Sequence, residues 1–169
     1  MKPLKIRLAT EGDLPAIAEI EASAYSNPWH PDTFRSLLRQ SRAKVLVAED
    51  KDGEVAGYAV YWWVLEQAEL ANLAVRGDQQ GQGVGGGILD RALLMAGNQG
   101  VESVFLEVRI SNEPARRLYA SRGFRQISVR EGYYQNPKED ALILVRSLGT
   151  VATGRGEEGK GHQEAVANS

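Results

Sequence analysis

A glycine-rich stretch at residues 80–87, QGQGVGGG, constrains this chain more than any other feature of the sequence. It follows an apolar run that ends at Val75, and it opens the helical apolar pattern that includes Ile88. Glycine lets the backbone bend and lets a ligand approach it closely, while the first N–H groups of a new helix point toward the same place. The stretch therefore predicts an anion site, with phosphate as the expected anion.

Composition narrows the classes of protein to consider. The 169 residues, 43% of them apolar, suffice for one domain with a hydrophobic core. A net charge of −2 gives no general basic surface, so we expect neither nucleic acid nor a membrane as a partner. The sequence has no cysteine and only two histidines, His30 and His162, which argues against a metal site and a histidine-based triad. No apolar run resembles a signal core or a membrane span, so we expect a cytoplasmic protein.

Hydrophobic periodicity predicts an α+β chain with an antiparallel beginning. The expected elements are strands at 6–8, 45–48, 55–64, 69–75, 103–108, 124–129 and 141–145, and helices that end near residues 25, 42, 98 and 123. The strand before the glycine stretch, the helix after it and the next strand form one crossover, which implies a parallel pair. A turn-rich segment at 132–138 is expected between the last two strands.

The chain is expected to form one domain at 1–148, followed by a short tail at 149–169. The tail consists mainly of glycine, charged and small residues, with almost nothing to bury. Such a composition cannot offset the entropy of ordering a chain, so we expect the tail to be disordered.

Two well-known phosphate loops fit the glycine stretch poorly. A P-loop needs Lys-Ser or Lys-Thr after its last glycine, whereas Ile88 stands there in this chain. A dinucleotide fingerprint is matched literally by Gly81, Gly83 and Gly86, and Glu107 follows at about the required 20 residues. However, residues 76–80 separate the first glycine from its strand, and too little chain follows for a second nucleotide-binding half. A dinucleotide-binding oxidoreductase is the alternative fold.

A third type of loop agrees better with the flanking residues. The pattern Gln80-x-x-Gly83-x-Gly85, between a strand and a helix, resembles the acetyl-CoA pyrophosphate loop of the GNAT superfamily of N-acetyltransferases. Further segments match the family in the same order: NLAV at 72–75, FLEVRISN at 105–112, LY at 118–119, RGF at 122–124, YY at 133–134 and EDA at 139–141. The last two segments are similar to the RimI-type ribosomal-protein alanine N-acetyltransferases. The resemblance covers residues 69–145 well and the earlier chain more sparsely.

The resemblance implies a GNAT-like fold, with a mixed, mostly antiparallel sheet flanked by helices and one parallel crossover at the acetyl-CoA loop. It implies acetyl-CoA as co-substrate, without a metal ion, and Glu107 as the catalytic base. From its strand pattern alone, Glu107 shares a face with Phe105, and a solvated acid is the simpler interpretation. Tyr119 matches the family residue that protonates the leaving thiolate, although its helical spacing would otherwise indicate a core tyrosine. A phenol with a pKa of about 10 suits that task.

The resemblance also assigns the cofactor-binding residues, which are Leu73, Ala74, Val75, Gln80, Gly81, Gln82, Gly83, Val84, Gly85, Gly86 and Asn112. Asn112 is expected to cap a helix in any case, and Gln80 could equally be an ordinary polar loop residue. The chain departs from the family at Gly86, where many relatives carry a longer or polar residue, and at residues 76–78, which lack a common proline. Both departures concern the affinity for the cofactor.

The acceptor implied by the resemblance is the N-terminal amine of a protein, with the alanine of a ribosomal protein as the first one to consider. An α-amine with a pKa of about 8 is partly neutral near pH 7, whereas a lysine is not, so a modest base suffices. Trp29, Tyr133 and Tyr134 could frame a site for a peptide N-terminus, or could equally anchor loops on the sheet. The acceptor could also be a different amine, such as lysine or a small molecule, and the chain could instead be a non-catalytic acyl-CoA-binding module.

Overall fold

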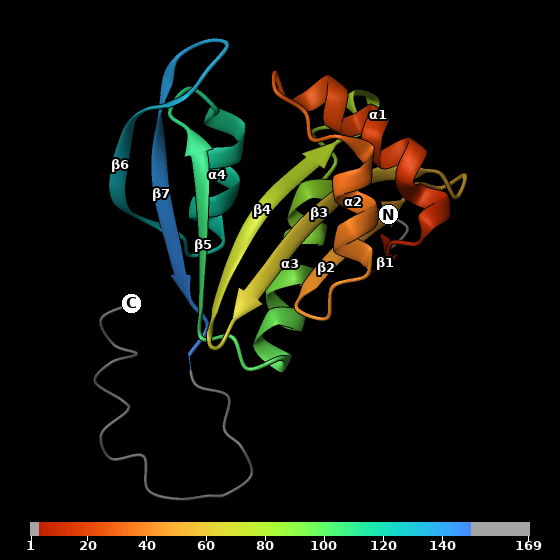
Figure 1. The fold of residues 1–169 in the computed structure, drawn as a ribbon, viewed down its shortest axis with the longest axis horizontal. Helices are drawn as coiled ribbons and strands as arrows, with labels where there is room; N and C mark the ends of the chain where they lie inside the picture. Colours follow the sequence, from red (N-terminus) through yellow and green to blue (C-terminus); the bar gives the residue numbers. More distant parts are fainter. Residues whose placement is uncertain (1–3, 150–169) are drawn as a thin grey trace, which may run out of the picture.

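The computed structural model describes residues 4–149. Apart from Gly149, the tail that we expect to be disordered lies outside these residues. Seven strands form one sheet in the order β1-β2-β3-β4-β5-β7-β6 (Figure 1). Their bounds are β1 (Lys5–Leu8), β2 (Ala43–Glu49), β3 (Val55–Val64), β4 (Gln67–Val75), β5 (Ser103–Arg109), β6 (Arg125–Tyr134) and β7 (Glu139–Ser147).

The pairing of these strands confirms the predicted fold class. Every neighbouring pair is antiparallel except β4 and β5, which are parallel. A dinucleotide-binding half would need several parallel strands side by side, so this sheet excludes that alternative fold.

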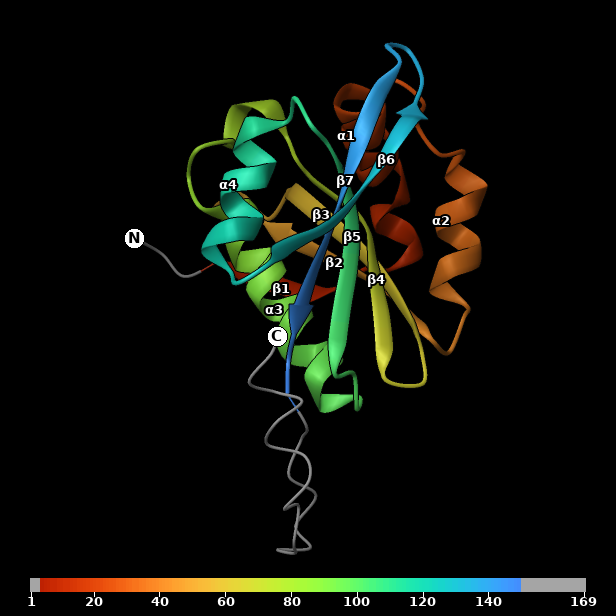
Figure 2. The same cartoon turned by 90° about the vertical axis from the view of Figure 1, so that its left-hand side faces the viewer.

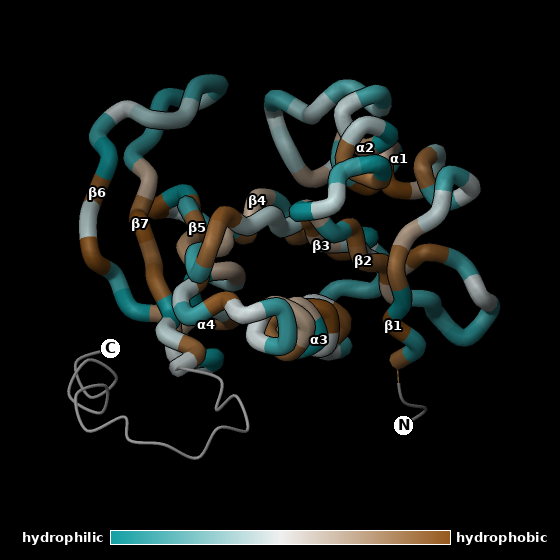
Figure 3. The backbone as a smooth tube through the Cα atoms, turned by 60° about the horizontal axis from the view of Figure 1, so that its bottom comes forward, coloured by the Kyte–Doolittle hydropathy of each residue, from teal (hydrophilic) through white to brown (hydrophobic). Residues whose placement is uncertain are grey.

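In the described part of the chain, four α-helices pack on the sheet. Figure 3 shows that they cover both of its faces. They are α1 (Leu14–Ala24) and α2 (Pro31–Leu38) on one face, and α3 (Val84–Asn98) and α4 (Glu113–Ser121) on the other. Two short 3-10 helices, η1 (Glu11–Asp13) and η2 (Gly77–Gln79), precede α1 and α3. Seen from the β6 edge of the sheet, α4 and α1 lie on opposite sides of β5 (Figure 2).

Alternating residues of each central strand supply two separate cores. In β2, Val45 and Val47 pack with Ile17 and Phe34 beneath α1 and α2, whereas Leu46 packs against α3. This alternation follows from the two-residue period of a strand and explains why the central strands are almost entirely apolar.

Two boundaries differ from the sequence prediction. The second helix ends at Leu38 instead of near Arg42, since residues 39–42 form the turn into β2. Strand β6 continues to Tyr134 instead of ending near Val129, with an irregularity in its pairing between Arg130 and Tyr134. The glycine in this region, Gly132, has a φ of +60° and accommodates the irregularity. Tyr133 and Tyr134 therefore belong to a strand, not to the predicted turn.

Strands β4 and β5 stay paired for only three residues each. Residues 67–69 pair with residues 103–105, and beyond that point the strands diverge, so that they form a V in Figure 1. Just past the last pair, β4 contains an extra residue relative to β3, because Val60 faces Asn72 while Tyr61 faces Leu70. A β-bulge of this kind bends its strand, and here it directs β4 away from β5.

The bulge also changes which face of the sheet each β4 side chain meets. Before it, Ala68 and Leu70 belong to the core beneath α3. After it, Leu73 packs against that same core, whereas Asn72 is buried toward Glu21 of α1 and Ala74 joins the core of α1 and α2. Where β4 diverges from β5, it thus presents the polar side chain of Asn72 to α1.

A glycine in β3 allows α3 to lie close to the sheet. A Cβ atom at Gly57 would stand 3.0 Å from the Ala74 carbonyl oxygen and 3.0 Å from Ile88 Cδ1. Gly57→Ala should therefore overpack this contact and lower the free energy of unfolding by about 1–3 kcal/mol, measured by urea denaturation. Gly77→Ala is the matched control, because a Cβ there has no neighbour within 4 Å among the described residues. Equal stability of the two variants would contradict the close approach.

Candidate functional site

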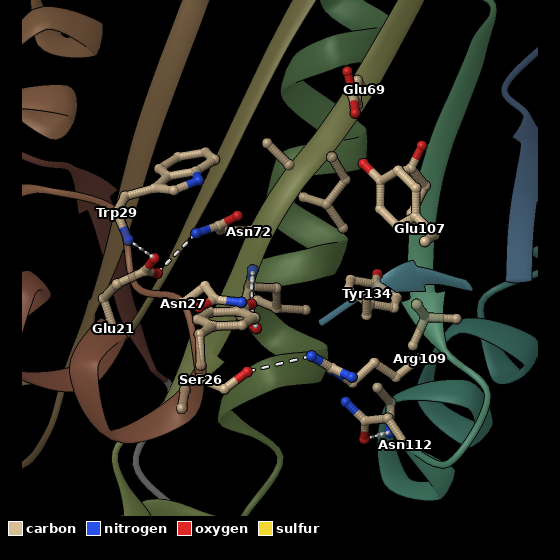
Figure 4. A pocket seen from close by; sticks show the side chains of 18 of the residues that line it. Glu21, Ser26, Asn27, Trp29, Glu69, Asn72, Glu107, Arg109, Asn112 and Tyr134 are labelled. Carbon is tan, nitrogen blue, oxygen red and sulfur yellow. Dashed lines mark hydrogen bonds between the residues drawn. The ribbon is translucent and has the colours of Figure 1, made fainter. Parts of the chain in front are cut away.

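A pocket of about 440 Å³ opens where β4 and β5 separate (Figure 4). It is lined by the end of α1 and the loop after it, by both diverging strands, by α4 and by the end of β6. Seven of the residues singled out from the sequence line it, namely Trp29, Leu73, Glu107, Asn112, Tyr119, Tyr133 and Tyr134. The fold thus brings together residues that lie up to about a hundred positions apart in the chain.

Glu107 lies in β5 and enters the pocket from the face that α1 covers. Its neighbours at the odd positions of the strand share this face, whereas Leu106 and Val108 are buried in the core beneath α3. The side chain is 21% exposed, and its Oε1 lies 3.2 Å from Arg130 Nη1 of β6. A hydrogen bond to the Glu107 carboxylate is also the main cause that raises the pKa of Tyr133. The carboxylate is thus held by two partners of β6.

Tyr119 lies in α4 and reaches the pocket from the opposite face of the sheet. It is only 7% exposed, and its ring packs edge-on against Phe124 with 5.6 Å between the centroids. Burial, together with the nearby hydroxyls of Tyr25 and Tyr134, raises its pKa well above the ordinary value. The phenol therefore stays protonated at neutral pH and can donate a proton or a hydrogen bond into the pocket. Tyr119 is thus a core residue that also borders the pocket.

The glycine stretch lies beyond the pocket, between the end of β4 and the start of α3. Gly81 and Gly83 have φ values of +77° and +83°, which side chains rarely adopt. A Cβ at either glycine would have no neighbour within 4 Å among the described residues, so the loop faces open space. The first-turn N–H groups of α3, which begins at Val84, have no partner inside the helix. This arrangement suits a phosphate group in contact with the backbone.

A charged clamp at Arg76 fixes the turn between β4 and the glycines. Its guanidinium donates to the Val55 carbonyl oxygen at 2.9 Å, to Asp50 at 2.8 Å and to Asp78 at 2.6 Å. These hydrogen bonds hold the pKa values of both carboxyl groups below their ordinary range. The Gln80 side chain adds a 3.2 Å bond to the Val75 carbonyl oxygen, so it has a structural role within the loop.

The space beside Gly86 is occupied by a side chain that follows another helix. A Cβ at Gly86 would meet the guanidinium of Arg122, which follows α4 and pairs with Asp90 of α3 at 3.1 Å. A cationic group therefore stands beside the loop at Gly86. No pattern near the loop indicates this contact, because Arg122 lies 36 positions further along the chain.

Asn112 caps α4 as predicted, because its side-chain oxygen accepts the Ala115 N–H at 3.2 Å. Trp29 stacks on Trp62 of β3, with 6.1 Å between the centroids, and also lines the pocket. It therefore anchors its loop on the sheet and borders the site. Tyr134 lies beneath the guanidinium of Arg109, which is 4.4 Å from the ring centroid.

Arg109 was not predicted from the sequence, although it joins two loops across the pocket. Its guanidinium donates to Ser26 Oγ at 3.2 Å in the loop between α1 and α2. It also donates to the carbonyl oxygens of Gln135 and Pro137, at 2.8 and 2.9 Å, in the turn between β6 and β7. One side chain thus ties together the two segments that border the entrance.

Glu21 is a second residue that sequence reasoning missed. It is 1% exposed, and its carboxylate accepts hydrogen bonds from the Tyr58 hydroxyl, from Asn72 Nδ2 at 2.7 Å and from the Trp29 N–H at 2.8 Å. Three donors compensate for burying a carboxylate. The only signal in the sequence was a glutamate at helical spacing from Leu14 and Ile17, on the apolar face of α1.

Within residues 4–149, no cluster of three or more histidine, cysteine or acidic side chains is arranged to hold a metal ion. In the same part of the chain, no helix is long and apolar enough to cross a membrane.

Comparison with known proteins gives consistent matches along most of the chain. The sequence profile described as "Acetyltransferase (GNAT) family" matches residues 14–124. The ribosomal protein bS18-alanine N-acetyltransferase of Escherichia coli K12 is 37% identical over 134 residues, which cover 78% of this chain and 89% of that protein. A Bacillus subtilis protein provisionally given the same name is 38% identical over 133 residues, 78% of this chain and 87% of its own.

Solved structures agree with these sequence matches. The crystal structure of the Escherichia coli ribosomal-protein-S18-alanine N-acetyltransferase superposes with a TM-score of 0.81 at 33% identity, and the match covers 90% of this chain and 98% of that one. A ribosomal-protein-alanine N-acetyltransferase from Brucella melitensis gives a TM-score of 0.76 at 26% identity, over 86% of this chain and all of that one.

The clamp at Arg76 leads to a prediction about the glycine loop. Arg76→Met keeps much of the side-chain volume but removes every hydrogen bond to Asp50, Asp78 and Val55, so the loop should lose its fixed geometry. We expect the Kd for acetyl-CoA to rise by roughly 10-fold, or about 1.4 kcal/mol, measured by titration calorimetry. Arg91→Met, at an exposed position of α3, is the control and should bind as the wild type does. Unchanged binding by both variants would show that the clamp does not organise the loop.

Proposed function

The chain belongs to the GNAT family of acetyltransferases, and we propose that it transfers the acetyl group of acetyl-CoA to the N-terminal α-amino group of a protein. The first acceptor to test is the N-terminal alanine of a ribosomal protein, because the relatives named above carry that activity in their names. Since ribosomal proteins are made in the cytoplasm, a cytoplasmic location is part of the same proposal. The observation that carries it is the pocket in the gap between β4 and β5, which Glu107 and Tyr119 line from opposite faces of the sheet.

Acetyl-CoA supplies an activated acetyl thioester. The chain has groups suited to bind each part of the acetyl-CoA molecule. Residues 80–86 would hold the pyrophosphate with backbone N–H groups and the N-terminus of α3, without a metal ion. The open space over Gly81 and Gly83 leaves room for that approach. Residues 73–75 would pair with the extended pantetheine arm as a neighbouring strand does, because β4 has lost its partner here. Asn112 borders the pocket at the start of α4 and would add a hydrogen bond.

Glu107 and Tyr119 would move the two protons of the reaction. As the amine nitrogen bonds to the carbonyl carbon, Glu107 would accept the proton that the nitrogen loses, through a water molecule. As the carbon–sulfur bond breaks, Tyr119 would give its proton to the sulfur, so that CoA leaves as a neutral thiol. Arg130 and Tyr133 hold the carboxylate of Glu107 in the pocket, and burial keeps Tyr119 protonated. Tyr119 thus begins in the protonation state that its role requires.

The shape of the entrance favours a chain end as acceptor. The loop after α1 and the turn after β6 are joined by Arg109, and a second link runs from Asn136 Nδ2 to Asn27 Oδ1 at 3.2 Å. A peptide N-terminus would enter beneath this bridge, between Trp29 and the pair Tyr133 and Tyr134, which line the pocket. An α-amine is also partly neutral at pH 7, so a carboxylate base suffices.

The acceptor assignment can be tested with two matched peptides. One begins with alanine and lacks lysine, and the other has a blocked N-terminus and a single internal lysine. We expect release of CoA thiol with the first peptide and little or none with the second. A panel that varies only the first residue then measures its preference. Faster acetylation of the blocked peptide would overturn the N-terminal assignment.

The role of Glu107 leads to a separate prediction. Glu107→Gln keeps the size of the side chain but cannot accept a proton, so kcat should fall by roughly 10²–10⁴-fold at saturating substrates. Thermal unfolding should show that the variant is folded. Glu66→Gln, at the exposed turn between β3 and β4, is the control and should retain full activity. Near-normal turnover by Glu107→Gln would remove it from the role of base.

A further inference from the structure

The end of α1 contacts β4 at two consecutive residues inside the gap. Glu21 and Tyr25 lie four positions apart, so both face the sheet. Glu21 accepts a hydrogen bond from the Asn72 side chain at 2.7 Å, and Tyr25 contacts the backbone of the next residue, Leu73. The carboxylate thus fixes the turn of helix from which Tyr25 projects.

The Tyr25 hydroxyl is bonded to both main-chain groups of Leu73. It donates to the Leu73 carbonyl oxygen at 3.0 Å and accepts the Leu73 N–H at 3.3 Å. In an antiparallel pair, residues alternately point their backbone groups toward and away from the partner strand. Leu73 therefore turns its N–H and C=O away from β3 and into the gap that β5 leaves open.

The environment of this hydroxyl keeps it protonated. The residue as a whole is 36% exposed, and its hydroxyl bonds the Leu73 backbone of β4. Burial raises the pKa of Tyr25 to about 12. The hydroxyl is also close enough to Tyr119 to contribute to the raised pKa of that phenol. Two protonated phenols, one from each side of the sheet, therefore border the same space.

We propose that Tyr25 is a catalytic residue whose hydroxyl donates a hydrogen bond to the carbonyl oxygen of the bound acetyl thioester. Together with the Leu73 N–H, it forms a two-donor site for the negative charge that develops on that oxygen. This role rests on the proposed function, in which the β4 edge binds the thioester and Tyr119 faces its sulfur.

Tyr25 keeps its proton throughout the proposed reaction. When the amine nitrogen bonds to the carbonyl carbon, the π electrons of the C=O bond move to oxygen, where the two donors stabilise them. They return as the carbon–sulfur bond breaks and the sulfur takes the Tyr119 proton. In the structure this hydroxyl engages both main-chain groups of Leu73, so on binding of the thioester it shifts away from them. The shift turns its O–H toward the substrate oxygen and releases the Leu73 N–H to the same oxygen, and the backbone need not move.

Infrared spectroscopy of acetyl-CoA labelled with ¹³C at the carbonyl tests this contact without any acceptor. A hydrogen bond lowers the stretching frequency of a carbonyl group, so the bound band should lie at higher wavenumber in Tyr25→Phe than in the wild type. Calorimetry should show that the preference for acetyl-CoA over CoA falls by roughly 5-fold, the worth of one hydrogen bond. Tyr61→Phe is the control, because Tyr61 donates to Gln99 at 2.8 Å on the α3 face, away from the pocket. It should change neither quantity.

A second substitution covers the case in which Tyr25→Phe folds poorly. Replacement of Tyr25 by 3-fluorotyrosine keeps the shape and lowers the pKa of the phenol, which makes it a stronger donor. The carbonyl band should then move to lower wavenumber than in the wild type.

Turnover supplies the second readout. We expect kcat of Tyr25→Phe to fall by roughly 100-fold, as for the loss of one oxyanion donor, while the KM for acetyl-CoA rises by no more than the roughly 5-fold expected from its binding. An unmoved carbonyl band would overturn the role of Tyr25. Tighter binding of acetyl-CoA with undiminished kcat would also overturn it, since the hydroxyl would then merely compete for the Leu73 N–H. If the wild type acetylated no amine, the proposed function would fail, yet the infrared result would still decide the contact.

Discussion

The early end of the pairing between β4 and β5 is the constraint on which the site depends. An interrupted ladder leaves backbone N–H and C=O groups without strand partners, and such groups must be satisfied in another way. Here a bulge at Ala71 turns β4 away, and the Tyr25 hydroxyl bonds the exposed groups of Leu73. The free-energy cost of interrupting the ladder between β4 and β5 is thereby limited to a few residues. These are also the residues that a ligand can reach.

Buried and half-buried charges hold the surrounding segments in place. Glu21 fixes α1 and the loop after it to β3 and β4, Arg76 fixes the glycine loop, and Arg109 joins the two segments at the entrance. Each of them makes several hydrogen bonds, which an isolated surface ion pair would not. Polar networks of this kind favour one arrangement of the backbone, because a partly satisfied network is costly in a low-dielectric interior.

Much of this architecture follows from local patterns in the sequence. Strand alternation, the glycine loop and the cap at Asn112 all lie within short windows, and the structure confirms them. Which residues face the gap depends instead on the single extra residue in β4, and a period-two pattern cannot reveal a bulge. The contacts of Glu21, Arg109 and Arg122 join residues far apart in the chain, so no local signal announced them. No sequence signal marked Tyr25 either, because its hydroxyl bonds main-chain groups, which carry no side-chain signature.

Glu107 and Tyr119 face the gap from the two sides of the sheet, which has a kinetic consequence under the proposed function. The thioester and the peptide can approach from opposite faces and be bound at the same time, so neither has to leave before the other arrives. Such a site favours a ternary complex with direct transfer over a ping-pong cycle through an acetylated enzyme. It also allows the modified peptide to leave while CoA is still bound. The segments that Arg109 joins at the entrance would then determine which product leaves first.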